Sequence, residues 1–168
     1  LNAICQVYLT IIRGTPMMVQ LMIMYFVVFS SSRHEVAVAT LAFGINSGAY
    51  VAEIVRGGIM SVDAGQMEAG RSLGMNYTQT MRHIIIPQAI KNILPALGNE
   101  MITLLKDTSL MTVIGAKDLT KAAQTVQAVT YQAFMPYISI AVIYLVCVIA
   151  LSKLLALIER RMRNSDRR

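Results

Sequence analysis

Charged residues are scarce in this sequence: 14% of its 168 residues carry a charged side chain, whereas 55% are apolar. A soluble globular chain averages about a quarter charged and about half apolar residues. The scarcity of charge therefore excludes an ordinary soluble domain as the first interpretation and favours an integral membrane protein. Three or four spans of about 20 residues each would occupy most of the chain and leave little room for a soluble domain.

Several chemical motifs are also absent. The phosphate-binding loop G-x-x-x-x-G-K-[ST] does not occur, so the chain carries no ATPase motif of its own. Neither the zinc motif H-E-x-x-H nor the nucleophile motif G-x-S-x-G occurs, which disfavours an intramembrane enzyme. We predict no catalytic residue, no metal ligand and no cofactor. The two cysteines, Cys5 and Cys147, lie in apolar segments, and we expect no disulfide.

Four apolar segments are long enough to be predicted as membrane spans. Residues 1–13 are expected to form an interfacial lead-in, and the Ala- and Gln-rich residues 116–135 are expected to form a helix on the outer surface. The predicted fold is all-α, a polytopic helical membrane protein with one transmembrane domain over residues 1–168. Because the chain begins with Leu, we expect a fragment with about four of five spans and a missing N-terminal one. The predicted spans are 15–31, 36–55, 93–115 and 137–158.

Basic residues set the expected orientation. The tail 159–168 holds five of the fifteen Lys and Arg residues. A nucleic-acid arm would also be basic, but this tail directly follows an apolar span, and the positive-inside rule then places it in the cytoplasm. The interval 56–91 is rich in Arg and Lys as well, and two crossings separate it from the tail. Both signals therefore predict the same side, and no nucleic-acid partner is expected.

A polar segment interrupts the apolar chain at its centre. Asp63 and Gln66 have the spacing of a capping box, which predicts a short helix running to Leu73, and Gly74 suits the left-handed residue after a helix end. Asn76 and Gln79 repeat the pattern, so a second helix is expected to start there and run toward Pro87. Two short helices joined at a glycine form a protruding docking surface; the alternative is an ordinary amphipathic loop between spans.

The sequence of this segment resembles a known family. Glu68-Ala69-Gly70, Leu73-Gly74 and residues 84–89, IIIPQA, resemble the EAA loop of the permeases of binding-protein-dependent ABC importers. Four further strings, in the same order along the chain, resemble the polar amino acid permeases of that family. They are RGTP (13–16), GAYVAEI (48–54), RGG (56–58) and LLKDTSL (104–110).

The resemblance implies a fold, a function and partners. It implies an ABC importer permease fold, a bacterial cytoplasmic (inner) membrane location with several spans, and ATP-driven import of polar amino acids, with basic ones or glutamine as candidates. Implied partners are cytoplasmic ATP-binding subunits, an extracytoplasmic solute-binding protein, a second permease subunit in a homo- or heterodimer, and membrane lipid. Residues 59–92 would form the cytoplasmic coupling loop, with ATPase-coupling residues Glu68, Ala69, Gly70, Leu73 and Gly74.

Two residues depart from the family pattern. Gly70 stands where the second Ala of the triplet is usual, and this lowers helix propensity by about 1 kcal/mol. Met81 stands where Phe is frequent, and it keeps an apolar side chain. Another small polar solute is the alternative substrate. An ion-driven carrier or channel is the alternative class, and it would need neither a docking loop nor ATP.

Charged residues within a predicted span indicate a substrate path. Glu100, Thr103 and Asp107 share one helix face by their spacing, and such charges face a bundle interior or a water-filled cavity. We expect this face to attract a cationic group; the alternative is a structural ion pair, for instance with Lys106 or Arg13. In the preceding span Ser47 and Tyr50 are further candidates, in a stripe that also suits helix packing or contact between subunits.

Overall fold

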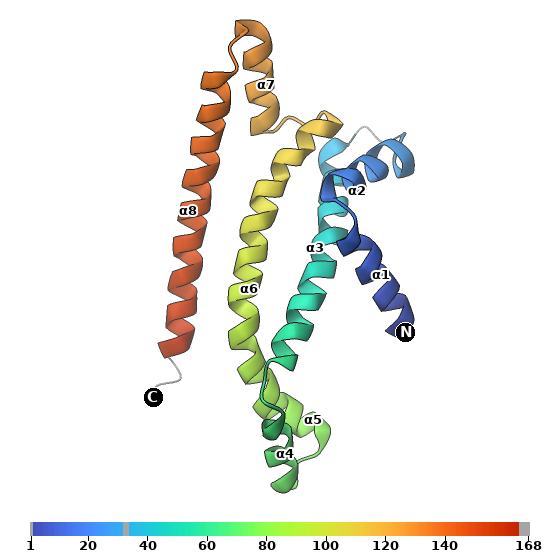
Figure 1. Cartoon of the computed structure of the whole chain (residues 1–168), viewed down its shortest axis with the longest axis vertical. Helices are drawn as coiled ribbons and strands as arrows, with labels where there is room; N and C mark the ends of the chain where they lie inside the picture. Colours follow the sequence, from blue (N-terminus) through green and yellow to red (C-terminus); the bar gives the residue numbers. More distant parts are fainter. Residues whose placement is uncertain (1, 32–33, 165–168) are drawn as a thin grey trace. The chain divides into compact units, whose positions relative to one another are not determined.

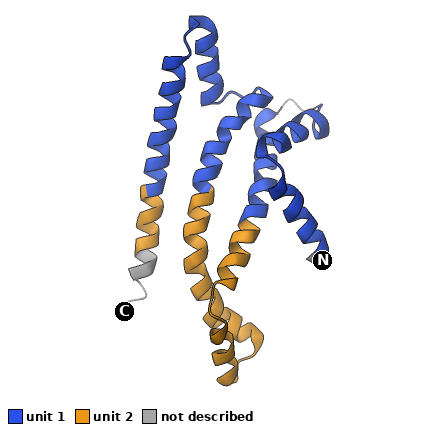
Figure 2. Cartoon of the chain, in the orientation of Figure 1, with its two compact units in different colours: residues 1–50, 101–152 blue, residues 51–100, 153–168 orange. Residues whose placement is uncertain are grey.

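The computed structural model describes residues 2–31 and 34–164, which form helices joined by short turns (Figure 1). The all-α prediction is confirmed. Tertiary contacts divide the chain into two compact units (Figure 2). Unit 1 comprises residues 1–50 and 101–152, and unit 2 comprises residues 51–100 and 153–168.

Unit 1 begins with a sharply bent helix pair. Helix α1 (Asn2–Gly14) ends where the chain reaches Pro16, and α2 (Met17–Ile23) continues into a π-helical turn (Met24–Val28). The bend between the two helices is 105°. The second arm is about 18 Å long at 1.5 Å per residue, well short of the roughly 30 Å hydrocarbon layer. This differs from the expected single span over 15–31, because neither arm is long enough alone.

Helix α3 (Glu35–Met60) and the stretch Phe134–Arg160 of α8 (Phe134–Asn164) are long and apolar enough to cross a membrane. Within the described part of the chain, the bent α1 and α2 pair would add a third crossing if it acts as one broken span. The expected spans 36–55 and 137–158 fall inside α3 and α8. Of the basic tail 159–168, residues 159–164 belong to α8, and residues 165–168 lie outside the described residues.

Helix α6 (Ile86–Asp107) replaces the expected span 93–115. Its α-helical part ends at Asp107, and a 3-10 segment (Thr108–Ile114) follows, closed by Gly115 with φ +86°. Because α6 contains Lys91 and a charged C-terminal end, it is less apolar than α3 and α8, and it is not among the helices that meet the length and hydropathy of a span. The predicted end at residue 115 lies beyond the end of the α-helix at Asp107, because apolar residues continue through the 3-10 segment.

The core of unit 1 lies where α2, α3 and the 3-10 segment meet. Helix α7 (Leu119–Thr130) follows, capped by Asp118, whose carboxylate accepts a hydrogen bond from the Lys121 amide at 2.7 Å. A helix within 116–135 is therefore confirmed, although its last residues belong to α8. The buried core side chains are Leu21, Ala39, Ala42, Phe43, Ile114 and Ala116.

Candidate functional site

The polar segment of unit 2 folds into two short helices, as its capping signals predict. Helix α4 (Ala64–Ser72) starts after Asp63, whose carboxylate accepts a hydrogen bond from the Gly65 amide at 2.6 Å. It ends at Ser72 with Leu73 as its C-cap, and Gly74 then adopts the left-handed conformation with φ +77°. One detail differs from the expected capping box: the Gln66 side chain accepts a hydrogen bond from Gln88 instead of reaching back to Asp63.

The second helix starts at its predicted cap and runs further than expected. The Asn76 carboxamide accepts from the Gln79 amide, and the Gln79 side chain accepts from the Asn76 amide, both at 2.9 Å. Helix α5 (Tyr77–Thr80) then passes through a π-helical turn (Met81–Ile85) directly into α6. The predicted run toward Pro87 is confirmed, and the helix continues past the proline. The widened turn accommodates the proline ring at the start of α6, where one missing backbone donor is tolerated.

We call residues 63–80 the elbow. Its surface carries most of the predicted coupling residues, since Glu68, Ala69 and Gly74 are exposed and the Leu73 side chain is 78% exposed. Gly70 differs, because it is buried against Thr80. The elbow therefore offers a carboxylate and an apolar side chain to solvent, while its small residue holds the two short helices together.

The predicted substrate-path residues lie on α3 and α6. Ser47 and Tyr50 of α3 are half-buried, as are Glu100 and Asp107 of α6, whereas Thr103 is exposed. Ser47, Tyr50, Thr103 and Asp107 belong to unit 1, and Glu100 belongs to unit 2. Their use by a substrate stays a prediction.

Tyr50 lies beside Arg13, the residue that was considered above as an ion-pair partner for the acidic face of α6. The Arg13 guanidinium of α1 stands 5.5 Å from the centre of the Tyr50 ring, within the range of a cation–π interaction. One turn further along α3, Glu53 forms an ion pair with Arg56. A cation from the bent pair thus lies against the α3 stripe that was proposed for substrate or packing.

A polar network that the sequence analysis missed fixes the bent pair on α3. The Gln20 amide nitrogen lies 2.6 Å from the Ile12 carbonyl oxygen and 2.7 Å from the Thr15 hydroxyl, so it satisfies acceptors at the break between α1 and α2. Asn46, 6% exposed, donates to the Gln20 side-chain oxygen at 3.0 Å. Nearby, the Tyr8 hydroxyl donates to the Ile45 carbonyl at 2.6 Å. In the sequence, this network is indicated only by two isolated side-chain amides, Gln20 and Asn46, within apolar segments.

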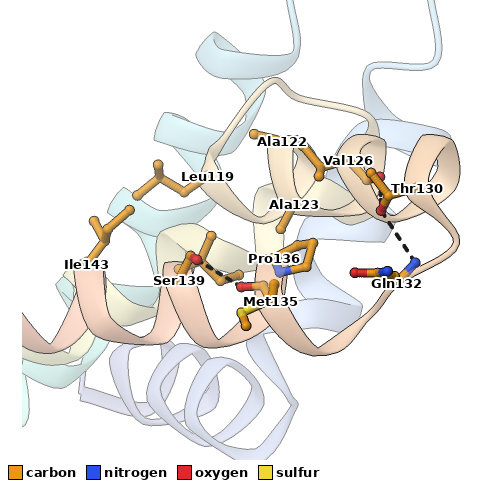
Figure 3. Close-up of a pocket in the computed structure, with 11 residues that line it drawn as sticks. Leu119, Ala122, Ala123, Val126, Thr130, Gln132, Met135, Pro136, Ser139 and Ile143 are labelled. Atoms are coloured by element: carbon orange, nitrogen blue, oxygen red, sulfur yellow. Dashed lines mark hydrogen bonds between the residues drawn. The ribbon is translucent and has the colours of Figure 1, made fainter.

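A cavity of about 400 Å³ lies between α7 and the start of α8 in unit 1 (Figure 3). Its walls are mostly apolar, and Ala123 of α7 lies toward Pro136 of α8 across it. At one end the Gln132 amide donates to the Thr130 hydroxyl. No charged side chain lines this cavity, so its chemistry suits apolar contact rather than an ionic solute.

Comparisons with known proteins identify the class. The family of binding-protein-dependent transport system inner membrane components matches residues 1–164. The glutamine transport system permease protein GlnP of Escherichia coli (strain K12) is 41% identical over 166 residues, which cover 96% of this chain and 76% of that protein. The arginine transport system permease protein ArtQ of Bacillus subtilis (strain 168) is 40% identical over 166 residues, 97% of this chain and 76% of the relative.

A solved structure agrees with the sequence relatives. The crystal structure of an amino acid ABC transporter with histidines matches 93% of this chain and 74% of its own chain, with 53% sequence identity and a TM-score of 0.86. The chain belongs to the family of binding-protein-dependent transport system inner membrane components. It is a multi-pass permease with the ABC importer permease fold, and the predicted fold class is confirmed.

Proposed function

We propose that this chain is the membrane-spanning permease subunit of an ATP-driven, binding-protein-dependent importer of polar amino acids. The relatives at about 40% identity are permeases for glutamine and for arginine, which supports this substrate class. The observation that carries the proposal is the elbow: two capped helices meet at Gly74 and expose Glu68 and Leu73. A transporter without an ATPase motif needs an exposed surface to which a partner ATPase can bind.

The elbow is the proposed docking site for the ATP-binding subunits. Glu68, Ala69, Leu73 and Gly74 supply the contact surface, and Gly70 supports it from beneath. The exposed apolar side chain of Leu73 can fill a groove on the partner, while the Glu68 carboxylate can pair with a partner cation. ATP hydrolysis then belongs to the partner, and the chain itself is no enzyme.

The other proposed partners follow from the same assembly. An extracytoplasmic solute-binding protein delivers the amino acid, and a second permease subunit, identical or homologous, completes the pathway. The apolar window of α8, none of whose residues is buried, is open to a second subunit or to membrane lipid. Nucleic acid is not among the partners.

The proposed topology places residues 59–92 and the C-terminus in the cytoplasm and residues 116–135 outside, in the bacterial cytoplasmic (inner) membrane. Its support is the charge distribution. Arg56, Arg71, Arg82 and Lys91 cluster around the elbow, and the tail is basic as well. A single topology satisfies both clusters if α6, with the 3-10 segment that follows it, crosses the membrane once and α8 crosses it a second time.

The proposed substrate path uses Glu100, Thr103 and Asp107 of α6 with Ser47 and Tyr50 of α3. A carboxylate at membrane depth is expensive unless it serves a function or a partner, and it attracts the ammonium or basic side chain of an amino acid. Glu100→Gln removes the charge and retains the shape. In the reconstituted importer it should lower uptake of basic amino acids more than uptake of glutamine, and unchanged uptake of basic amino acids would contradict the role of Glu100.

The decisive test of the proposed function is uptake into proteoliposomes. The permease is reconstituted with its ATP-binding subunits and the solute-binding protein, and labelled glutamine or arginine is supplied outside. Uptake should require ATP and the ATP-binding subunits. Equal uptake without ATP, driven by an ion gradient, would indicate the alternative class of an ion-driven carrier.

A further inference from the structure

The elbow is joined to the rest of unit 2 by two arms, the C-terminal end of α3 and the N-terminal part of α6. We propose that four contacts make the elbow and both arms one stiff lever. Three of them join residues 58–66 to α6, and the fourth joins Gly70 to Thr80 within the elbow; Ser61, Gln66, Gln88 and Asn92 act as positioning residues. This inference rests on the proposed function, since a lever matters only if a partner moves the elbow.

The first contact lies at the base of the arms. Gly58 of α3 is buried, and a Cβ placed there would lie 2.2 Å from Cγ1 of Ile93 and 3.4 Å from the carbonyl oxygen of Ala89. Both neighbours belong to α6. The two helices therefore approach so closely that the Ile93 side chain occupies the space above the glycine, and sliding of one arm along the other would create a clash.

Two hydrogen bonds form the next contacts. The Asn92 side-chain amide donates to the Ser61 hydroxyl at 2.8 Å, and the Gln88 amide donates to the Gln66 side-chain oxygen at 3.2 Å. Gln88 and Asn92 are four residues apart, so they lie on one face of α6. This face of α6 therefore holds Ser61, directly after α3, and Gln66, in the first turn of α4.

One side chain of each pair also forms a hydrogen bond with the backbone of its own segment. The Ser61 hydroxyl donates to the Gly58 carbonyl at 2.8 Å, and the Gln88 side-chain amide donates to the Ile84 carbonyl at 3.0 Å. A side chain held at both ends loses little further freedom when it bonds across the arms. The bonds between the arms are thus preorganised, and they link backbone to backbone through one or two side chains.

The fourth contact closes the tip. A Cβ on Gly70 would lie 2.5 Å from the Thr80 methyl group, and Thr80 is 0% exposed, with its hydroxyl bonded to the Asn76 carbonyl at 3.0 Å. The Met75 amide donates to the Gly70 carbonyl at 3.1 Å. The turn between the two short helices therefore cannot open without exposing Thr80.

Together the four contacts exclude a soft hinge between the elbow and the arms. When a partner displaces α4, the displacement passes to the ends of α3 and α6 instead of being absorbed by bending of the residues 61–63 or 73–76. Loss of one of the hydrogen bonds to α6 introduces such a hinge. Part of each movement of the ATP-binding subunits then bends the elbow instead of moving α3 and α6. The measurable consequence is a larger number of ATP molecules hydrolysed for each amino acid imported.

The test measures this ratio in the complete importer in proteoliposomes, for wild type, Gln66→Leu, Gln66→Glu and Thr40→Ala. Gln66→Leu removes the acceptor, whereas Gln66→Glu keeps an acceptor for Gln88. Thr40→Ala is the matched control, because its hydroxyl donates to the Val36 carbonyl within α3 and lies outside the elbow. One hydrogen bond corresponds to about a fivefold change in an equilibrium, so Gln66→Leu should raise the ratio by up to about fivefold, with Gln66→Glu and Thr40→Ala near wild type.

The outcomes separate the lever from the proposed function. If wild-type importer shows no ATP-dependent uptake, the proposed function fails. If wild type transports and Gln66→Leu keeps the wild-type ratio, the lever alone is contradicted. Amide hydrogen exchange of the wild-type importer needs no variant: the Met75 and Thr80 amides should be protected as strongly as those in the middle of α6, and rapid exchange at both would overturn the lever.

Discussion

Gly70→Ala tests the packing of the elbow, because two effects of opposite sign compete. Ala is a better helix former than Gly by about 1 kcal/mol, so an exposed glycine in α4 would gain stability on this change. Gly70 is instead buried, and the new Cβ would meet the Thr80 methyl group at 2.5 Å and the Thr80 hydroxyl oxygen at 2.7 Å. Overpacking of this kind costs typically about 1–3 kcal/mol. The net expectation is a loss of stability between zero and about 2 kcal/mol.

A double substitution separates the clash from other effects. In Gly70→Ala with Thr80→Ala, both atoms closest to the new Cβ are gone, and the remaining neighbour is the Thr80 Cβ at 3.1 Å. Thr80→Ala alone also loses the hydroxyl bond to Asn76, worth about 1 kcal/mol. Because the two changes act on one contact, the double variant should be destabilised by less than the sum of the single variants, with a coupling energy of at least about 0.5 kcal/mol.

The assay is thermal unfolding of the purified permease, with wild type, both single variants and the double variant in the same detergent. Gly57→Ala in α3 is the control, since among the described residues no atom beyond its two chain neighbours and its own helix backbone lies within 4 Å of a Cβ built there. It should leave the unfolding temperature unchanged or raise it. An increase in stability for Gly70→Ala equal to that of the control would refute the packing of Gly70 against Thr80.

Three further changes probe other parts of the fold by the same unfolding measurement. Gly74→Ala should cost about 1–2 kcal/mol, because Ala is disfavoured at φ +77°, and Gly74→Asn should cost less; equal stability of all three would contradict the left-handed turn. Asn46→Leu should cost about 1–3 kcal/mol, because it leaves the Gln20 side-chain oxygen without its donor, and an unchanged unfolding temperature would contradict the network. Tyr8→Phe should cost about 0.5–1.5 kcal/mol through loss of the bond to Ile45, and a stabilised variant would contradict that bond.

The elbow could be predicted from the sequence because its signals are local. Asp63, Asn76 and Gln79 satisfy orphan amides at helix starts, and Gly74 supplies the left-handed end, so each choice depends on residues within a few positions. The same local reasoning carried the second helix only toward Pro87 and did not show that it continues. There the π-helical turn, a feature without a composition signal, lets the helix continue.

The bent pair and the cross-arm contacts could not be predicted, because they depend on residues distant in sequence. Asn46 bonds Gln20 26 positions away, and Asn92 bonds Ser61 31 positions away. The sequence showed polar amides in apolar helices without showing which would meet. Gly70 was interpreted as a departure that weakens a helix, whereas its contact with Thr80 explains why a residue without a side chain stands there.

The central claim is that the elbow is a cytoplasmic handle for an ATP-driven partner, and side-specific labelling tests it most directly. A single cysteine is introduced by Leu73→Cys at the exposed position of the elbow, with Cys5 and Cys147 replaced by Ala. A membrane-impermeant maleimide should label it in inside-out vesicles and not in intact cells. Assembly with the ATP-binding subunits should block the labelling. Labelling of intact cells from outside would contradict the account.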